Sequence, residues 1–398
     1  MRRYLYICIA VFIVITFAFI GLKAAQKDWI SAWTASLQTP SDDGISSEGF
    51  KNQTLRFIVK PHIDGKKMRI RLSNIFGSNS LTINQVNVAI MKNGAENIPS
   101  SGKQLTFKGD GKVTIPKGGR VFSDPINFEV DTEETLSISV YVKDSTGPAS
   151  WHPHSLQTSY IASGNHAATS DASNFDKGKE AWFWLDGIDV KPTSSIDGAV
   201  AVVGDSIANG NHSTLDKNRR WPDYLSKRFN KKKSQAHLSV LNAGISANQL
   251  LKTEKGEHVL ARLDHDVFNQ SGIESIILHA GINDIRYHPE YPAENLIKRM
   301  KKVIDVTHKK GLKIYGATLT PFKDSGKYTA EGERTRQKIN HWIRSSGEFD
   351  GVIDFDKALS DPEAPEQFLP EYDEGDHFHP NDKGYKKMAK IIDLSMFK

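Results

Sequence analysis

The segment AVVGDSIANG, residues 201–210, contains the strongest indication of the fold in this chain. It begins as a run of small apolar residues, as expected of a buried strand, and it ends at Gly204, Asp205 and Ser206. A buried strand gains nothing from ending on a carboxylate and a hydroxyl unless its end faces a ligand or a tight turn. The question is therefore which fold places Ser206 at a strand end, and which residues meet it there.

Short apolar runs alternate with longer amphipathic segments after residue 198. The run AVAVVGDS precedes RWPDYLSKRFN, and SIILHAGIND precedes PAENLIKRMKKVIDVTHKKG. Such alternation predicts an α/β domain over residues 198–398, with a parallel sheet and helices on both faces. Ligands bind at the carboxyl ends of the strands in such sheets. Ser206 is therefore predicted to lie on the functional edge.

Residues 28–190 follow a different period. Apolar residues alternate with polar ones in LRFIVK, residues 55–60, and in LSISVYV, residues 136–142, and turn residues such as PKGG separate the runs. Period two predicts short antiparallel strands. This part of the chain is therefore expected to form an antiparallel β-sandwich domain of the jelly-roll type.

Residues 1–25 have the pattern of a signal peptide or a membrane anchor, because Arg2 and Arg3 precede an apolar run. Either alternative places the remainder outside the cytoplasm, at an extracellular site or on the outer face of the cell membrane. The one cysteine, Cys8, lies in this leader, so the exported part forms no disulfide. An uncleaved anchor is the only membrane contact that the sequence predicts.

The charged residues give no sign of a nucleic-acid partner. The formal net charge is +5, from 52 Lys and Arg against 47 Asp and Glu. The densest basic run, NKKK at residues 230–233, has the length of an ordinary solvated helix end. No nucleic-acid binding is therefore expected.

The motif DEGDHFHPNDKGY near the C-terminus supplies partners for Ser206. Its Asp376 lies three residues before His379, so one imidazole nitrogen can bind the carboxylate while the other stays free. A serine hydroxyl is a poor nucleophile until a neutral base takes its proton. We therefore predict Ser206 as the nucleophile, His379 as the general base and Asp376 as the group that orients the base.

Negative charge that builds on a substrate oxygen needs donors already in place. The predicted oxyanion donors are the backbone N–H of Ser206, the backbone N–H of Gly244 and the side-chain amide of Asn283. Gly244 and Asn283 follow two further apolar runs, so all three are expected at the same edge of the sheet.

These segments resemble a known family. Ser206 in GDSI, Gly244 in NAGISAN, Asn283 in GIND and His379 in DHFHP are similar, in order and rough spacing, to the four blocks of the SGNH hydrolases, also called GDSL-type esterases and lipases. The resemblance runs from about residue 198 to the end. It implies a flavodoxin-like sheet and serine esterase chemistry without a metal or other cofactor.

The rest of the chain resembles a secreted subfamily that carries an N-terminal β-domain, through WISAWTAS, IRLSNIFG and RWPD. Two positions depart from the family pattern. Ile207 replaces the usual leucine, and Ala247 stands where many relatives have glycine. The second departure leaves the shape of the second block open.

Other side chains have competing interpretations. The HFH sequence, with His377 two residues before His379, could bind a metal, but no further ligand cluster accompanies it. His152 in WHPH is a possible substrate contact or an ordinary loop residue. Asp284 is a second possible substrate contact, although Asp205 and Asp284 are expected mainly to hold their own loops.

The sequence thus predicts an exported serine carboxylic-ester hydrolase that works through an acyl-enzyme. Its expected partner is an acylated carbohydrate or a small ester, from which it removes short acyl groups such as acetyl. The alternative within enzymes is a lipase or lysophospholipase. The alternative outside enzymes is a carbohydrate-binding protein whose hydrolase domain is inert.

Overall fold

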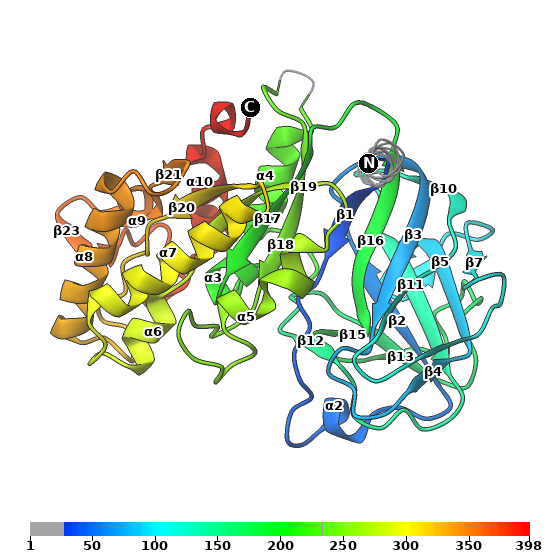
Figure 1. The fold of residues 1–398 in the computed structure, drawn as a ribbon. Helices are drawn as coiled ribbons and strands as arrows, with labels where there is room; N and C mark the ends of the chain where they lie inside the picture. The colour runs from blue at the N-terminus through cyan, green and yellow to red at the C-terminus, as the bar shows by residue number, and fades with distance from the viewer. Residues whose placement is uncertain (1–27, 232–233) are drawn as a thin grey trace, which may run out of the picture.

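The computed structural model describes residues 28–231 and 234–398 (Figure 1). The predicted leader at residues 1–25, including Cys8, lies outside the described residues. None of the helices in the two described ranges is both long enough and apolar enough to cross a membrane. The main antiparallel sheets precede residue 193, and the parallel sheet begins at Gly198.

The N-terminal part contains two antiparallel sheets, drawn in blue to green in Figure 1. The first has the order β1 (Ile30–Thr34), β16 (Leu185–Pro192), β3 (Gly65–Ser73) and β10 (Ile126–Val130), with β9 (Arg120–Phe122) beside β3. The second has the order β14 (Asp176–Lys177), β13 (Tyr160–Ser163), β2 (Gln53–Val59), β11 (Leu136–Val142), β5 (Gln85–Asn93) and β6 (Glu96–Asn97), with β7 (Lys103–Leu105) beside β5.

Smaller elements complete this part. They are the pair β12 (Trp151–Pro153) and β15 (Ala181–Phe183), the pair β4 (Leu81–Ile83) and β8 (Val113–Ile115), and the short helix α2 (Ile45–Glu48). Leu136, Ile138 and Val140 alternate along β11 and are fully buried in the hydrophobic core. The predicted period-two pattern and the antiparallel architecture are therefore confirmed.

The C-terminal part is built on a five-stranded parallel sheet. Its order is β18 (Leu238–Gly244), β17 (Gly198–Gly204), β19 (Ile273–His279), β20 (Lys313–Ala317) and β21 (Gly351–Ile353). In chain order this reads 2-1-3-4-5, the flavodoxin-like order, in which the first strand lies between the second and third. The predicted flavodoxin-like sheet is confirmed.

Helices cover the sheet in two groups (Figure 1). One group is α5 (Val259–Leu263), its continuation as the π-helix η1 (Asp264–Phe268), α6 (Ile282–Tyr287), α7 (Ala293–Lys309) and α8 (Ala330–Ser345). The other is α4 (Trp221–Phe229), α9 (Phe355–Leu359) and α10 (Asp382–Ile391). The remaining elements are α3 (Ser206–Asn209), the hairpin β22 (Ser360–Asp361) and β23 (Ala364–Phe368), and the 3-10 helix η2 (Leu394–Phe397).

The two parts of the chain share one continuous hydrophobic core. Strand β1 packs against β18, and the backbone N–H of Ser31 donates to the carbonyl of Ser271 over 2.9 Å. Strand β12 lies near α3, the short helix that begins at Ser206. The β-rich part therefore touches the end of the sheet that carries the predicted nucleophile.

Candidate active site

Ser206 is the first residue of α3, immediately after β17. Gly204 allows the end of β17 to lie close to β19, because a Cβ at this position would lie 2.3 Å from the carbonyl oxygen of His279. Asp205 caps the helix, and its Oδ1 accepts from the N–H of Ile207 over 3.0 Å. The polar end of this apolar strand thus makes a tight strand-to-helix turn that presents Ser206.

Ser206 and His379 form a hydrogen bond across the carboxyl edge of the sheet. The distance from Ser206 Oγ to His379 Nε2 is 2.8 Å. On the other side of the ring, His379 Nδ1 lies 2.6 Å from Asp376 Oδ2. Because a carboxylate can only accept, Nδ1 carries the proton and Nε2 accepts from the serine. The structure thus brings together the three residues predicted as the triad.

The loop before α10 fixes Asp376 by itself. Its Oδ1 accepts from the backbone N–H groups of Phe378 and His379, over 3.0 and 2.7 Å. Burial acts to raise the pKa of Asp376, but the hydrogen bonds and charge of His379 outweigh it and hold that pKa below its usual value. Asp376 is therefore ionised at neutral pH.

Burial has the opposite effect on the base. It lowers the pKa of His379 from its ordinary value, although Asp376 partly compensates by favouring the charged ring. His379 is therefore neutral at pH 7, the state in which Nε2 can take a proton.

The rival His377 points elsewhere. Its Nδ1 lies 2.7 Å from Asp373 Oδ2, and 53% of its side chain is exposed. A different neighbour, His212, has its ring centroid 4.7 Å from that of His379 and its Nε2 3.8 Å from Asp376 Oδ2. His212, Asp376 and His379 are close enough to form a metal-ligand cluster, whereas His377 is not part of it.

Asn283 lies in the first turn of α6 and is buried. Its Nδ2 is 3.3 Å from the carbonyl of Asn248, a long hydrogen bond that leaves the second amide hydrogen available. The predicted donor thus lies beside the loop that follows β18.

Gly244, the other predicted donor, ends β18. Its N–H donates to Asn242 Oδ1 over 3.0 Å, so this donor already has an acceptor. The absent side chain matters instead for packing, because a Cβ on Gly244 would lie 2.3 Å from the backbone nitrogen of Asn209. Three residues on, Ala247 has φ +62°, a left-handed conformation that favours glycine. The departure noted at Ala247 therefore lies at a turn whose backbone conformation favours glycine.

Asp284 is fully buried and holds its own neighbourhood. Its two oxygens accept from the N–H groups of Leu250 and Leu251, over 2.8 and 2.9 Å. Burial raises the pKa of Asp284 to about 6, and these bonds oppose that rise. The expectation that Asp284 holds its loop fits these contacts better than a contact with substrate does.

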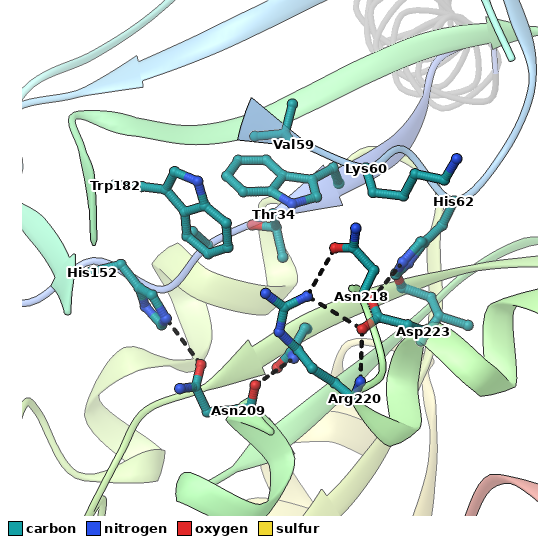
Figure 2. A pocket seen from close by; sticks show the side chains of 14 residues that line it. Thr34, Val59, Lys60, His62, His152, Trp182, Asn209, Asn218, Arg220 and Asp223 are labelled. Atoms are coloured by element: carbon teal, nitrogen blue, oxygen red, sulfur yellow. Dashed lines mark hydrogen bonds and ion pairs between the residues drawn. The ribbon is translucent and has the colours of Figure 1, made fainter. Parts of the chain in front are cut away.

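His152 also lies away from the surface, with 2% of the residue exposed. Figure 2 shows its ring joined to Asn209. The cavity beside it measures about 20 Å³, enough for about one water molecule. Its ring contacts Ser36 and Asn209 rather than open space. The possible substrate contact at His152 is therefore corrected, since burial leaves no room there for a substrate. Sequence alone gave no signal for Asn209 as its partner.

Residues 202–387 match the model of the GDSL-like Lipase/Acylhydrolase family. A comparison with curated proteins finds no match. Similar solved structures include a GDSL-like lipase from Bacteroides thetaiotaomicron VPI-5482, with 17% identity over 50% of this chain and 88% of that chain and a TM-score of 0.40. A carbohydrate acetylesterase from Sinorhizobium meliloti has 12% identity over 48% and 94% and a TM-score of 0.38.

A member of the lipolytic protein G-D-S-L family from Veillonella parvula DSM 2008 has 19% identity over 48% of this chain and 94% of that chain, with a TM-score of 0.38. The family match begins within β17, the strand that leads into Ser206, and extends into α10, which follows His379. Residues 202–387 thus match a GDSL-like lipase/acylhydrolase domain, the SGNH hydrolase type, and this match indicates a hydrolase of the esterase and lipase class.

Proposed function

We propose that this protein is a serine carboxylic-ester hydrolase that forms an acyl-enzyme on Ser206. One observation carries the proposal: the unbroken hydrogen-bond chain from Ser206 Oγ through the His379 ring to Asp376, with distances of 2.8 and 2.6 Å. A nucleophile, a base within reach and an orienting carboxylate are the parts that acyl transfer requires.

The reaction proceeds in two halves. Ser206 Oγ attacks the ester carbonyl while His379 Nε2 takes the hydroxyl proton, and the imidazolium is stabilised by Asp376. The tetrahedral intermediate expels the alcohol, which receives that proton from His379. Water then attacks the acyl-enzyme with His379 as base again, and the carboxylic acid leaves with Ser206 restored.

The oxyanion needs donors that are not already engaged. We assign the Ser206 N–H and the Asn283 amide to this role. For the third donor, the loop residue Ala247 is a better candidate than Gly244, because the Gly244 N–H already donates to Asn242. Ala247 follows the same strand by three residues and adopts the left-handed turn.

The proposed substrate is a carbohydrate that carries short acyl groups, such as acetyl. A lipase takes long chains through a broad exposed apolar face. Among the described residues the only large hydrophobic side chains that are exposed are Ile98 and Val352, in the β-rich part and at β21. Polar groups, His212 and Glu374, lie beside the triad instead. These surroundings favour a polar alcohol and a short acyl group.

The proposed place of action is outside the cytoplasm, at an extracellular site or on the outer face of the membrane. The support is the leader sequence, with Arg2 and Arg3 before an apolar run and no cysteine after Cys8. Membrane contact would require that the leader is retained as an anchor.

The test is a panel of p-nitrophenyl esters of graded chain length beside acetylated xylan, with native enzyme and Ser206→Ala. We expect acetyl and propionyl esters to be cut faster than octanoyl esters, acetate to be released from the polymer, and all activity to vanish in Ser206→Ala. Rates that rise with chain length beyond eight carbons would support the lipase alternative. Binding of the polymer by native enzyme without ester cleavage would support the inert carbohydrate-binding alternative.

A further inference from the structure

The β-rich part of the chain contributes a buried histidine, His152, that bonds to Asn209 of the nucleophile helix α3 (Figure 2). His152 comes from β12, and its ring stacks on Trp182 of the paired strand β15 at a centroid distance of 5.5 Å. Trp182 in turn meets Trp33 edge to face at 4.9 Å. These aromatic contacts hold the imidazole in one orientation.

Both ring nitrogens of His152 have partners. Nδ1 lies 2.7 Å from the carbonyl oxygen of Ser36, and Nε2 lies 2.9 Å from Asn209 Oδ1. Asn209 Nδ2 lies 2.8 Å from the carbonyl of His154, which can only accept. This contact fixes the orientation of the Asn209 amide, so Asn209 turns its Oδ1 toward His152 Nε2. Burial lowers the pKa of His152 to about 4, so the ring is neutral and carries one N–H, for which the Ser36 carbonyl and Asn209 Oδ1 are alternative acceptors.

Asn209 is the last residue of α3, whose first residue is Ser206. Its amide also contacts Asn211 Oδ1 at 2.9 Å and Ser246 Oγ at 3.3 Å. The N–H of Asn211 donates to the carbonyl of Ser206 over 2.9 Å. One carboxamide thus connects the nucleophile helix to the loop that follows β18.

That loop carries groups assigned above to the oxyanion site. Ser246 precedes Ala247, and the carbonyl of Asn248 accepts from Asn283. Ser246 Oγ also donates to Asn211 Oδ1 over 2.8 Å. A rotation of the Asn209 amide would therefore disturb the nucleophile side and the oxyanion side together.

We infer that His152 is a positioning residue for the proposed hydrolysis: through its contact with the Asn209 side chain, it holds Ser206 and the loop at residues 245–248 in register. The inference rests on the proposed function. This role would make the β-rich part a structural component of the active site. The β-rich part would then affect the hydrolysis of small esters as well as that of polymers. Displacements of about 1 Å in a catalytic group lower rates on the order of 100-fold.

The test compares His152→Leu with His152→Gln, using p-nitrophenyl acetate. Leucine fills much of the space without a polar atom, whereas the glutamine amide can still form a hydrogen bond with Asn209. We expect His152→Leu to lower kcat about 10- to 100-fold, with KM changed less than about twofold, and His152→Gln to recover most of the loss. The concentration of active sites is measured by titrating Ser206 with a fluorophosphonate, and kcat is calculated from that concentration, so that unfolded protein does not lower it.

His62→Leu is the matched control. His62 is buried at the same interface, with Nδ1 2.5 Å from the carbonyl of Val240 and Nε2 3.1 Å from Asp223, so its ring bonds to neither end of α3. We expect His62→Leu to lower the melting temperature while kcat per reactive Ser206 stays unchanged. Both histidines contact the C-terminal part, so a general loss of interface stability would affect the two variants alike.

Asn209→Ala provides the same test from the other partner if His152→Leu does not fold. We expect Asn209→Ala to lower kcat by a similar factor, and the double variant to be no slower than Asn209→Ala alone. An unchanged kcat in His152→Leu, equal kcat losses in the two histidine variants, or multiplying losses in the double variant would overturn the inference. Failure of native enzyme to react at Ser206 would instead overturn the proposed function.

Discussion

Ser206 Oγ and His379 Nε2 lie 2.8 Å apart although 173 positions separate the two residues in the chain. The parallel sheet makes this possible, because β17 ends at the same edge that the loop before α10 crosses. Asp376 does not depend on contacts between distant segments, since it lies three residues from His379 and binds that residue's ring and backbone. The nucleophile depends on the fold, whereas the pair of base and acid is built locally.

The two neighbouring histidines should differ sharply in their effect on catalysis. His379→Ala removes the base and is expected to lower kcat by several orders of magnitude. His377→Ala should change kcat little, because His377 pairs with Asp373 and is half exposed. Steady-state kinetics of both variants check this expectation. Similar losses in the two variants would show that the loop has been misinterpreted.

The acid limb of the pH profile should lie lower than that of an ordinary histidine. Protonated His379 cannot accept the serine proton, so kcat/KM follows the neutral fraction. Because burial lowers the pKa of His379, protonation requires a more acidic solution, and the midpoint should fall below the ordinary value of about 6.5. Profiles of kcat/KM from pH 4 to 9 measure it. A midpoint above 7 would contradict the burial of the base.

Asn283→Ala should lower kcat about 10²- to 10³-fold, the size associated with one oxyanion donor. Asn283→Asp should be at least as damaging, because it replaces the donor with a negative charge facing the oxyanion. Steady-state kinetics on p-nitrophenyl acetate measure kcat and KM of both variants, and melting curves check that the variants fold. A change confined to KM would assign Asn283 to substrate binding instead.

Asp205 makes the stability of the fold depend on pH. Burial raises its pKa to about 7, partly opposed by the N–H of Ile207, so the fold favours the protonated carboxyl. Its stabilising contribution is present below the unfolded value of about 4 and is lost as pH rises through about 7. Asn at this position keeps the acceptor for the Ile207 N–H and does not titrate.

Asp205→Asn should therefore gain in melting temperature over the native protein as pH rises from 5 to 8. Subtracting the native melting temperature at each pH cancels contributions common to both proteins, including most of that of Asp284, whose pKa is also raised by burial. A difference between the two melting temperatures that does not vary with pH would show that Asp205 does not titrate in this range.

The sequence was sufficient for the features that depend on local pattern. Apolar runs that end in polar residues predicted β17 and its continuation into Ser206, and the spacing of Asp376 and His379 predicted their contact. Period-two alternation likewise predicted the antiparallel strands of the N-terminal part. Each of these features depends on only a few consecutive residues.

Features that depend on contacts between distant segments were not predictable in the same way. His152 binds Ser36 and Asn209, which lie 116 and 57 positions away, and nothing in WHPH indicates either partner. Gly244 appeared suited to binding an oxyanion, but its N–H binds the nearby Asn242 side chain, a rotamer choice that sequence does not reveal. Only the assembled sheet and loops determine which donors remain available.

The role of Ser206 as nucleophile is tested most directly by reaction of the native protein with a fluorophosphonate, followed by peptide mass spectrometry. An activated serine attacks phosphorus and expels fluoride, so we expect one adduct, on Ser206, and simultaneous loss of esterase activity. Labelling should be greatly slowed in His379→Ala, which keeps the serine but lacks the base, and absent in Ser206→Ala. An adduct on another residue, or esterase activity that survives complete labelling of Ser206, would contradict the assignment of Ser206 as the nucleophile.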